Sequence, residues 1–189
     1  AVAQLWGAQQ YAKIATGRTA AGQPDLQTAF TPQELTLVAE RIRARCDALD
    51  GVADGIVGDV QACQKQFDFA RDLPACSGER NGQCLTPAQK DTLARVFAGA
   101  RNRRGEALYS AFPFDPGLSG QDWRDWKFAS PGTRDAAAVA FIFSTPPLAD
   151  RAPGLPFALG FDMDRDAPRI AATDGTYRSS ALDFMLPPA

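Results

Sequence analysis

Residues 46–63 read CDALDGVADGIVGDVQAC, a stretch in which two cysteines enclose a loop rich in aspartate and glycine. Its four aspartates fall within thirteen positions: Asp47, Asp50, Asp54 and Asp59. Carboxylates this dense repel one another unless a cation holds them, and Ca²⁺ takes carboxylate and backbone oxygens in tightly turned loops. An EF-hand is excluded because the twelfth position counted from Asp50 is Gln61 and not glutamate. The pattern leaves two interpretations, a calcium loop or a solvated turn closed by a disulfide.

The chain has four cysteines, in two close pairs: Cys46 with Cys63, and Cys76 with Cys84. There is no CxxC pattern and no histidine, so disulfides are favoured over a zinc site. Three pairings are possible from the sequence, and the local one is favoured because each loop is short and can turn back. Each bridge is worth roughly 2–4 kcal/mol. We therefore expect an oxidising compartment, either the periplasm or the outside of the cell.

Composition excludes several classes of function. The chain has 189 residues, 45% hydrophobic and 22% charged, with a net charge of −2. This gives no case for nucleic-acid binding, and no apolar run is long enough to predict a membrane span. Because the chain contains no histidine, it cannot hold a Ser–His–Asp triad, a Cys–His dyad or a His-ligated zinc ion. It begins at Ala1 without an initiator methionine, so we expect a processed product or an excised piece of a longer protein.

Helices dominate the predicted structure. Thr31-Pro32-Gln33-Glu34 and Thr86-Pro87-Ala88-Gln89 are both typical of a capped helix start, and an apolar stripe follows each. They predict helices to about residue 45 and to near residue 99. A short helix is expected within residues 5–14, and a buried helix over 136–143, stopped by two prolines. The fold class is therefore mainly α, with long irregular loops.

The remaining segments are predicted to be irregular. Residues 17–24 indicate a loop, residues 46–85 a loop-rich region, and the chain after residue 99 is broken by proline and glycine. Residues 148–160 predict a Pro/Gly loop, and 161–166 together with 170–173 a surface connection. The tail, 182–189, carries no structural signal.

Several motifs, in order along the chain, carry a resemblance. The string CDALDGVADGIVGD is followed by CLTPAQ at 84–89, GEALY at 105–109, WRDW at 123–126, FSTPP at 143–147 and FDMDRD at 161–166. Together they resemble the lid domain of the tannase and feruloyl esterase family of α/β-hydrolases, especially its mono(2-hydroxyethyl) terephthalate hydrolase (MHETase)-like members. The resemblance covers about residues 28–184, and the cysteine–aspartate string is its most specific part.

The resemblance implies a calcium site and two disulfides. The family's calcium ligands fall on the side chains of Asp47, Asp50 and Asp54 and on the backbone carbonyls of Val52 and Ile56. Asp59 matches no ligand position. The lid disulfides of the family fall on Cys46–Cys63 and Cys76–Cys84.

It also implies a missing partner, the α/β-hydrolase catalytic domain. The family's nucleophile lies in a Gly-x-Ser-x-Gly elbow, which is absent from this sequence, as is its histidine. We therefore expect residues 1–189 to form a single lid domain that is inserted in a hydrolase and stabilised by disulfides and calcium. Residues 1–27 and 185–189 would connect it to the catalytic core, with the two ends near the same face.

Two residues are candidate contacts to an aromatic ester substrate. Trp126, the second tryptophan of WRDW, falls on an aromatic position of the family's lid, and the alternative is a core aromatic. Arg134 is the candidate partner of a free substrate carboxylate, and the alternative is a solvated surface arginine. Arg124 is expected to make a structural salt bridge. The loop between Trp126 and Phe143 is shorter than in MHETase, and no phenyl clamp aligns, which weakens the case for a terephthalate monoester.

Three functions follow. The first is the lid of a secreted or periplasmic serine ester hydrolase acting on aromatic esters of the terephthalate, ferulate or gallate type, with the isolated chain inactive. The second is a stand-alone calcium-stabilised binding module, and the third an inhibitor-like secreted protein.

Overall fold

The structure, a computed structural model, describes residues 2–148 and 153–170. The α-helices of this part are α1 (Val2–Ile14), α2 (Pro32–Cys46), α3 (Val60–Gln66), α4 (Phe69–Asp72), α5 (Pro87–Phe97), α6 (Gln121–Arg124), α7 (Arg134–Ala137) and α8 (Leu155–Gly160). Turns of π-helix follow α6 (Asp125–Ala129) and α7 (Ala138–Ile142). Two short strands, β1 (Gly17–Arg18) and β2 (Pro24–Asp25), pair antiparallel with Gly17 opposite Asp25. Single turns of 3₁₀-helix lie at Leu26–Thr28, Asp47–Asp50, Pro116–Ser119 and Ser130–Gly132. The predicted class, mainly α with irregular loops, is confirmed.

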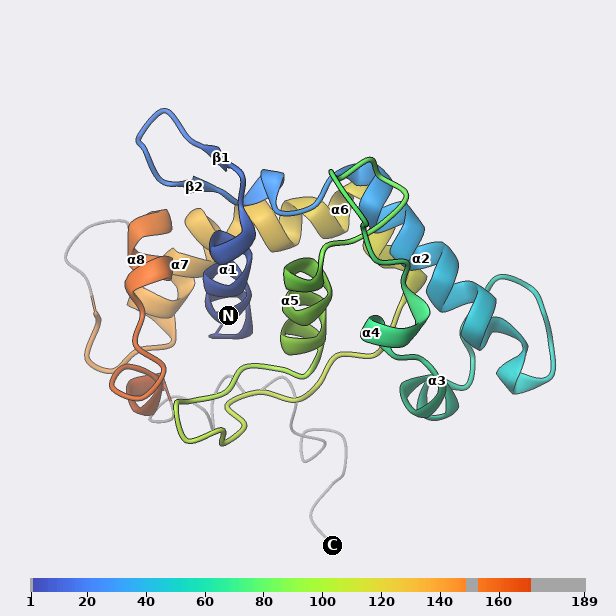
Figure 1. The fold of residues 1–189 in the computed structure, drawn as a ribbon. Helices are drawn as coiled ribbons and strands as arrows, with labels where there is room; N and C mark the ends of the chain where they lie inside the picture. The colour runs from blue at the N-terminus through green and yellow to red at the C-terminus, as the bar shows by residue number, and fades with distance from the viewer. Residues whose placement is uncertain (1, 149–152, 171–189) are drawn as a thin grey trace, which may run out of the picture.

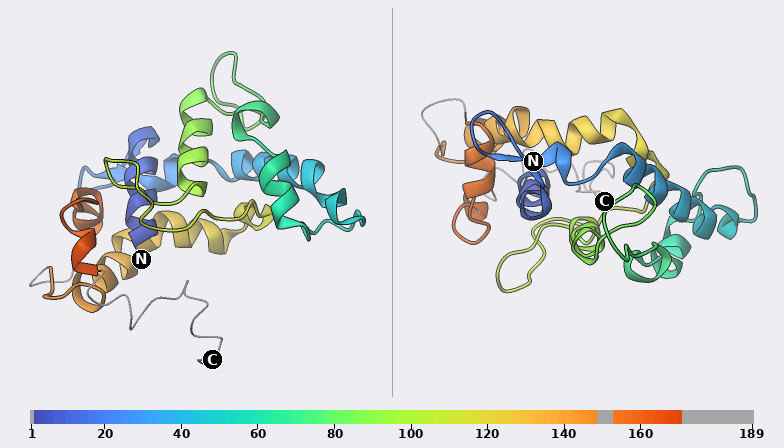
Figure 2. Two further views of the ribbon diagram at one scale, coloured as in Figure 1. Left: turned by 90° about the horizontal axis from the view of Figure 1, so that it is seen from below. Right: turned by 45° about the horizontal axis from the view of Figure 1, so that its top comes forward.

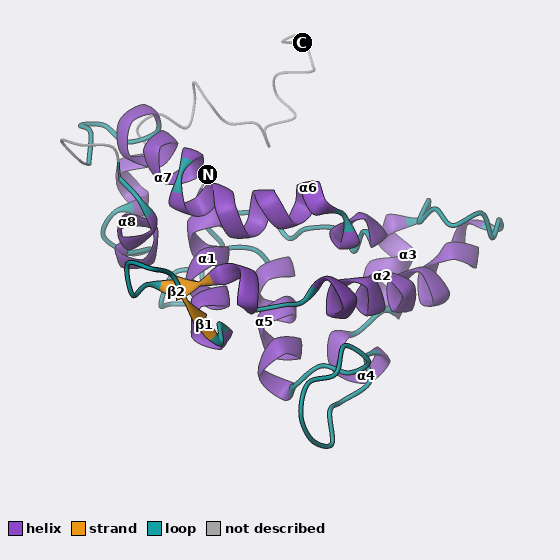
Figure 3. Ribbon diagram, turned by 90° about the horizontal axis from the view of Figure 1, so that it is seen from above, coloured by secondary structure: helices purple, strands orange, loops and turns teal. Residues whose placement is uncertain are grey.

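The helices surround a central pair. Helices α1 and α5 pack side by side, while the stretch from α6 to α7 runs along one side of the molecule (Figures 1 and 3). Helix α8 packs on α1 at one end. The aspartate-rich loop between α2 and α3 projects from the opposite end, in all views (Figures 1 and 2). The loop is therefore remote from α8.

Both predicted capped helix starts are confirmed. The Thr31 hydroxyl accepts from the Glu34 backbone N–H at 3.2 Å, and the Thr31 N–H donates to the Glu34 carboxylate at 2.8 Å. Thr86 and Gln89 make the same reciprocal pair at 3.2 and 2.9 Å. Each pair satisfies two backbone donors that the first turn of a helix leaves without an intrahelical partner.

The two capping boxes are joined through their side chains. The Gln89 amide donates to Glu34 Oε2 at 3.0 Å, and Arg80 Nη2 donates to the same oxygen at 2.6 Å. Burial raises the pKa of the Glu34 carboxyl, but its hydrogen bonds from Arg80, Thr31 and Gln89 outweigh burial, and the pKa lies below its ordinary value. The starts of α2 and α5 are thus tied by one buried carboxylate.

The core has two parts that share α1. The larger cluster joins α1, α2 and α5 through fully buried side chains such as Tyr11, Leu35 and Leu93. The smaller cluster packs Leu5 against the π-helical turn after α7, helix α8 and the loop after it. Residues 2–14, which lie in the segment expected to connect to another domain, are therefore part of the packed body.

The predicted loop over 148–160 is wrong for its second half, which forms α8. Pro156 lies in the first turn of this helix, where the fixed φ of proline suits a helix and its missing N–H costs nothing. The surface connection predicted at 161–166 is also wrong in part, because Phe161 and Met163 are buried in the smaller cluster. Proline and glycine here mark a helix start and a tight turn.

Other segments depart less from the prediction. The helix expected at 136–143 is present as α7 and its π-helical turn, but Phe141 and Ile142 are 41% and 53% exposed, so its end is not buried. The loop-rich region contains the short helices α3 and α4, and the loop at 17–24 carries β1 and β2.

No helix in the described ranges is long and apolar enough to cross a membrane. Ala1, residues 171–173, the tail from 182 and the closing segment 185–189 lie outside the described residues.

Candidate functional site

The aspartate-rich loop is closed at its base by a disulfide. Cys46, at the end of α2, is bonded to Cys63 on α3, with 5.1 Å between the Cα atoms. A second disulfide joins Cys76 and Cys84, so the local pairing is confirmed. Gly51 and Gly55 take positive φ angles of 96° and 88° within the loop, a conformation that glycine adopts without steric cost. The covalent closure and these two turns together set the path of the loop.

The predicted calcium-binding aspartates hydrogen-bond to backbone amides of their own loop. Asp47 Oδ1 accepts from the N–H groups of residues 54 and 55 at 3.1 and 2.8 Å. Asp50 accepts from residue 52 through Oδ1 at 3.0 Å and from residue 58 through Oδ2 at 3.1 Å. Asp54 Oδ1 accepts from Ile56 at 3.0 Å. All three carboxylates therefore stabilise the turns of the loop by accepting hydrogen bonds from its backbone amides.

Asp59 has a different position. Its Oδ1 accepts from the Ala62 N–H at 2.8 Å and caps the start of α3. This is a structural role, which agrees with its absence from the set of expected ligands.

The donor chemistry of the loop suits a hard cation, since it offers carboxylate oxygens and backbone carbonyls and no nitrogen or sulfur ligand. Val52 and Ile56, whose carbonyls complete the expected set, have side chains 58% and 64% exposed. Within residues 2–148 and 153–170, however, no three His, Cys, Asp or Glu side chains are grouped so that they could hold a metal ion. The calcium site therefore remains a prediction.

Trp126 lies beside a small aromatic cavity. It is on the π-helical turn after α6, is 39% exposed, and lines a cavity of about 150 Å³ together with Phe97, Phe112 and Trp123. The next residue, Lys127, is only 4% exposed and also lines the cavity. Its ammonium lies 3.9 Å from the centroid of the Trp126 ring and 4.3 Å from that of Phe112. Trp126 is thus available at the surface next to a buried cation.

Lys127 lies in an environment that is unusual for a charged side chain. Burial lowers the pKa of its ammonium to about 8, while the Asp135 carboxylate acts in the opposite direction. The burial of Lys127 could not be predicted from the sequence, because lysine is ordinarily a surface residue and no spacing distinguishes this one. Its position after the second tryptophan of WRDW was the only available signal.

The two arginines of this region have separate positions. Arg134, at the start of α7, is exposed; its Nε lies 3.5 Å from Asp135 Oδ1, and it is not among the residues lining the aromatic cavity. Among the residues that the structure describes, Arg124 has no carboxylate partner for the expected salt bridge. Its Nη1 donates to the Phe30 carbonyl at 2.8 Å and its Nη2 to Gln27 Oε1 at 2.9 Å, so backbone and amide oxygens take the place of a carboxylate.

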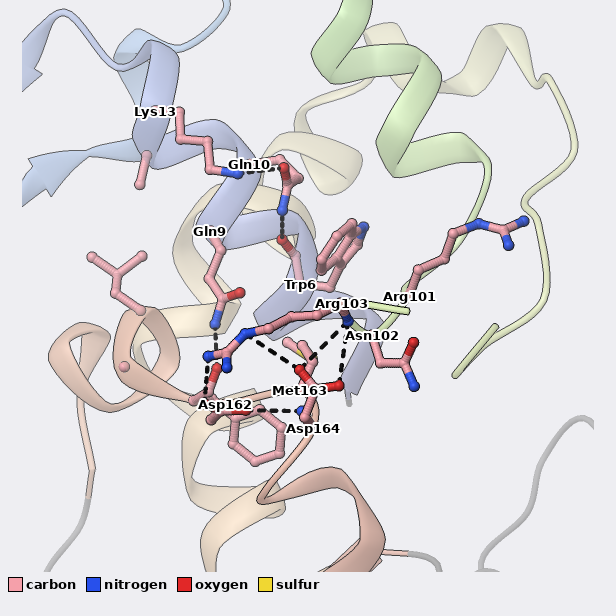
Figure 4. A pocket seen from close by; sticks show the side chains of 14 residues that line it. Trp6, Gln9, Gln10, Lys13, Arg101, Asn102, Arg103, Asp162, Met163 and Asp164 are labelled. Carbon is pink, nitrogen blue, oxygen red and sulfur yellow. Dashed lines mark hydrogen bonds and ion pairs between the residues drawn. The ribbon is translucent and has the colours of Figure 1, made fainter. Parts of the chain in front are cut away.

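A larger groove, of about 550 Å³, lies between α1, the loop after α5 and the loop after α8. Figure 4 shows Arg103 reaching across it to the aspartates of the FDMDRD motif, with Nη2 2.8 Å from Asp162 Oδ2 and Nε 3.4 Å from Asp164 Oδ2. Gln9 donates to the Phe161 carbonyl at 2.7 Å from the α1 side. These contacts fasten the loop after α8 to the rest of the fold.

Comparison with known proteins places the chain in a family. Residues 1–146 match the family model described as "Tannase and feruloyl esterase". The mono(2-hydroxyethyl) terephthalate hydrolase of Piscinibacter sakaiensis is 34% identical over 210 residues, which cover 97% of this chain and 34% of that protein. Feruloyl esterase C of Talaromyces stipitatus is 30% identical over 101 residues, covering 53% of this chain and 18% of the relative.

The fold is shared with a solved structure, feruloyl esterase B from Aspergillus oryzae. The TM-score is 0.62 at 24% identity, and the match covers 92% of this chain and 31% of that one. The sequence thus spans about a third of the length of the MHET hydrolase and of this esterase. The chain belongs to the tannase and feruloyl esterase family.

Proposed function

We propose that this chain is the lid of a serine carboxylic-ester hydrolase that acts on aromatic esters. One observation carries the proposal: a member of an esterase family contains neither a histidine nor a Gly-x-Ser-x-Gly pattern. The base and the nucleophile elbow of such an enzyme must then lie outside these residues, and the chain spans only about a third of the MHET hydrolase. What remains for it is to cover the active site and contact the substrate.

The aromatic substrate class is supported by two observations. The relatives are named for mono(2-hydroxyethyl) terephthalate and for feruloyl esters, which are aromatic. Trp126 presents a partly exposed ring that can stack on an aromatic acyl group, a contact worth about 1 kcal/mol. Arg134, also exposed, is the proposed partner for a free substrate carboxylate. The partner of the chain is the α/β-hydrolase catalytic domain.

Calcium is proposed as a structural ion of the aspartate-rich loop. The side chains of Asp47, Asp50 and Asp54 and the carbonyls of Val52 and Ile56 would hold it, and it would neutralise the charge of these carboxylates. The two disulfides support a periplasmic or secreted location, since such bonds persist in oxidising compartments.

The direct test of the proposal is an ester-hydrolysis assay of the isolated chain. Acetyl, feruloyl and terephthaloyl p-nitrophenyl or methyl esters should show no turnover above the buffer rate. Turnover that follows the protein peak through repurification would contradict it. A stand-alone binding module would be indicated if the same preparation bound aromatic acids tightly but a hydrolase core containing it gained no substrate preference from it.

A further inference from the structure

The Lys127 ammonium is a buried cation that makes no ion pair with any carboxylate of residues 2–148 and 153–170. The side chain is 4% exposed, and its Nζ donates one hydrogen bond, to Gln4 Oε1 at 3.3 Å. Among the ion pairs of the described residues none involves this lysine. Placing an ammonium in a low-dielectric environment is costly unless it is paired. An ammonium has three N–H donors, so Lys127 has capacity for an anionic acceptor.

Aromatic rings supply part of the compensation. The Nζ atom lies 3.9 Å from the Trp126 centroid, 4.3 Å from that of Phe112 and 6.0 Å from that of Trp123. In such cation–π contacts the electron-rich ring faces attract the ammonium. They retain the charge at this place without neutralising it.

The adjoining cavity has the size and the walls of a site for one aromatic ring. Its volume is about 150 Å³, and its wall includes the aromatic rings of Phe97, Phe112, Trp123 and Trp126. An engineered apolar cavity of about this volume binds benzene. Asp115 also lines the cavity, but its Oδ1 accepts from the Gly117 N–H at 2.7 Å and caps a 3₁₀ turn.

We propose that this cavity is a subsite for a planar aromatic ring that bears an anionic group, a carboxylate or a phenolate, with Lys127 as its charge partner. The ring would pack on Trp126 and the neighbouring aromatic walls while the anion meets the ammonium. That the ligand is an ester substrate rests on the proposed function. The binding of an aromatic anion in this cavity does not depend on that function. The anion could be part of an ester substrate or of a free acid.

The test measures binding to the 189-residue chain by isothermal titration calorimetry. Benzoate is compared with benzamide, its neutral analogue, and with cyclohexanecarboxylate, an anion without an aromatic ring. We expect benzoate to bind at least about tenfold more tightly than either analogue, a difference of about 1.4 kcal/mol. Equal binding of benzoate and benzamide, or binding of none of the three, would overturn the subsite.

Substitutions assign the charge partner. Lys127→Met should reduce benzoate binding to the benzamide level, and Lys127→Arg should retain most of it. Lys65→Met, which removes an exposed lysine on α3, is the matched control and should leave both affinities unchanged. Loss of benzoate binding in Arg134→Met, with Lys127→Met unaffected, would overturn the proposal and assign the anion to Arg134.

The pH dependence gives a second readout that needs no variant. Because burial lowers the pKa of Lys127 to about 8, the ammonium loses its proton as the pH rises through this value. Benzoate stays anionic, so its affinity should fall between pH 7 and 9.5 while that of benzamide stays constant. The other titratable groups facing the lysine are Asp115 and Asp135. A flat profile for benzoate would overturn the role of Lys127.

One further probe, monomethyl terephthalate, distinguishes the two sources of the anion. Monomethyl terephthalate carries the anion on an ester, and its binding alongside benzoate would indicate an ester substrate; binding of benzoate alone would indicate a free acid. Both results support the subsite. Benzoate binding is measured on the isolated chain, without any hydrolase domain. Binding can therefore confirm the subsite even if the proposed lid function is wrong, and the lid function can be correct even if benzoate does not bind.

Discussion

Asp50 and Asp59 lie nine residues apart in one disulfide-closed loop, yet their carboxylates make different contacts. Asp50 accepts from two amides inside the loop, whereas Asp59 caps α3. The first is the residue proposed to bind calcium, and the second stabilises the start of α3. A pair of substitutions can therefore distinguish metal binding from simple loop stability.

Calcium should raise the melting temperature of the chain, and EDTA should lower it, because the ion binds the folded loop. At 100 times the dissociation constant the gain is about 2.7 kcal/mol. Asp50→Ala should abolish the difference between the two conditions. Asp59→Ala should cost about 1 kcal/mol in both, as the loss of a cap. Identical wild-type melting curves in calcium and EDTA, with no ion in metal analysis, would leave only the solvated turn.

Trp126→Ala should weaken aromatic substrates selectively. We consider a chimera in which this chain replaces the aligned segment of the P. sakaiensis hydrolase. Loss of stacking should lower kcat/KM for aromatic esters about fivefold, or about 1 kcal/mol, and leave short acetyl esters nearly unchanged. Arg134→Ala tests the alternative anion partner to Lys127: if Arg134 holds the carboxylate, only substrates with a free carboxylate should be weakened, and an unchanged kcat/KM for them would leave the anion with Lys127. If Trp126→Ala lowers both ester series equally, the ring is a structural residue and its binding role must be abandoned.

Among single residues, the sequence allowed prediction of those whose contacts are with residues nearby in the chain. The spacing of cysteines and aspartates predicted both disulfides and the loop between them, because those contacts lie within about twenty residues. Lys127 could not be found, because its hydrogen-bond partner Gln4 is 123 residues away in sequence. Its unusual environment arises only after α1 has packed against the turn that follows α6.

Among the elements, α2 and α5 are joined where they begin, by the contacts of Glu34 with Arg80 and Gln89. The carboxylate is fully buried, and Arg80 also donates to the carbonyls of Thr28 and Ala29. Truncating one partner of a buried ion pair is costly because the other partner loses its compensation. This link therefore has more effect on stability than the exposed ion pairs do.

Glu34→Gln should lower the free energy of unfolding by about 3 kcal/mol at pH 7. The folded-state pKa of Glu34 lies below its ordinary value, so its contribution is fully present above the unfolded pKa, near 4.3, and is lost as the pH falls through the folded pKa. Urea titrations from pH 7 to pH 3 should show that wild type loses its advantage over the variant in the acid range. Glu40→Gln, exposed on the same helix, is the control and should change little. A constant difference between wild type and Glu34→Gln across this range would contradict the account.

Some helices could be predicted from the sequence and others could not, depending on whether the residues that determine them are close together in the chain. The starts of α2 and α5 depend on residues three apart, so the sequence contains the whole signal. Helix α8 is only six residues long and begins with Gly-Leu-Pro, a composition that also occurs in loops. It is held in place by packing on α1, which is far away in sequence. The exposure of the end of the helix at 136–143 could not be predicted either, because the spacing of apolar residues does not show which of them lack a packing neighbour in the fold.

For the whole molecule, the chain combines the fold of an esterase family with a sequence that has no histidine. The two clusters of the core share α1, so the described part packs as one body although it spans about a third of the MHET hydrolase. The aspartate-rich loop and the aromatic cavity are different places on this body. Under the proposed function, the chain would supply the recognition of a substrate and not its chemistry.

The most direct test of that division is the substrate preference of the chimera. The ratio of kcat/KM for aromatic esters to that for acetyl esters is measured for the P. sakaiensis hydrolase and for the chimera that carries this chain. We predict that acetyl-ester kcat/KM stays within about threefold, because the catalytic groups are unchanged, while the ratio shifts by about tenfold or more. An unchanged ratio in an active chimera, or ester turnover by the isolated chain, would contradict the account.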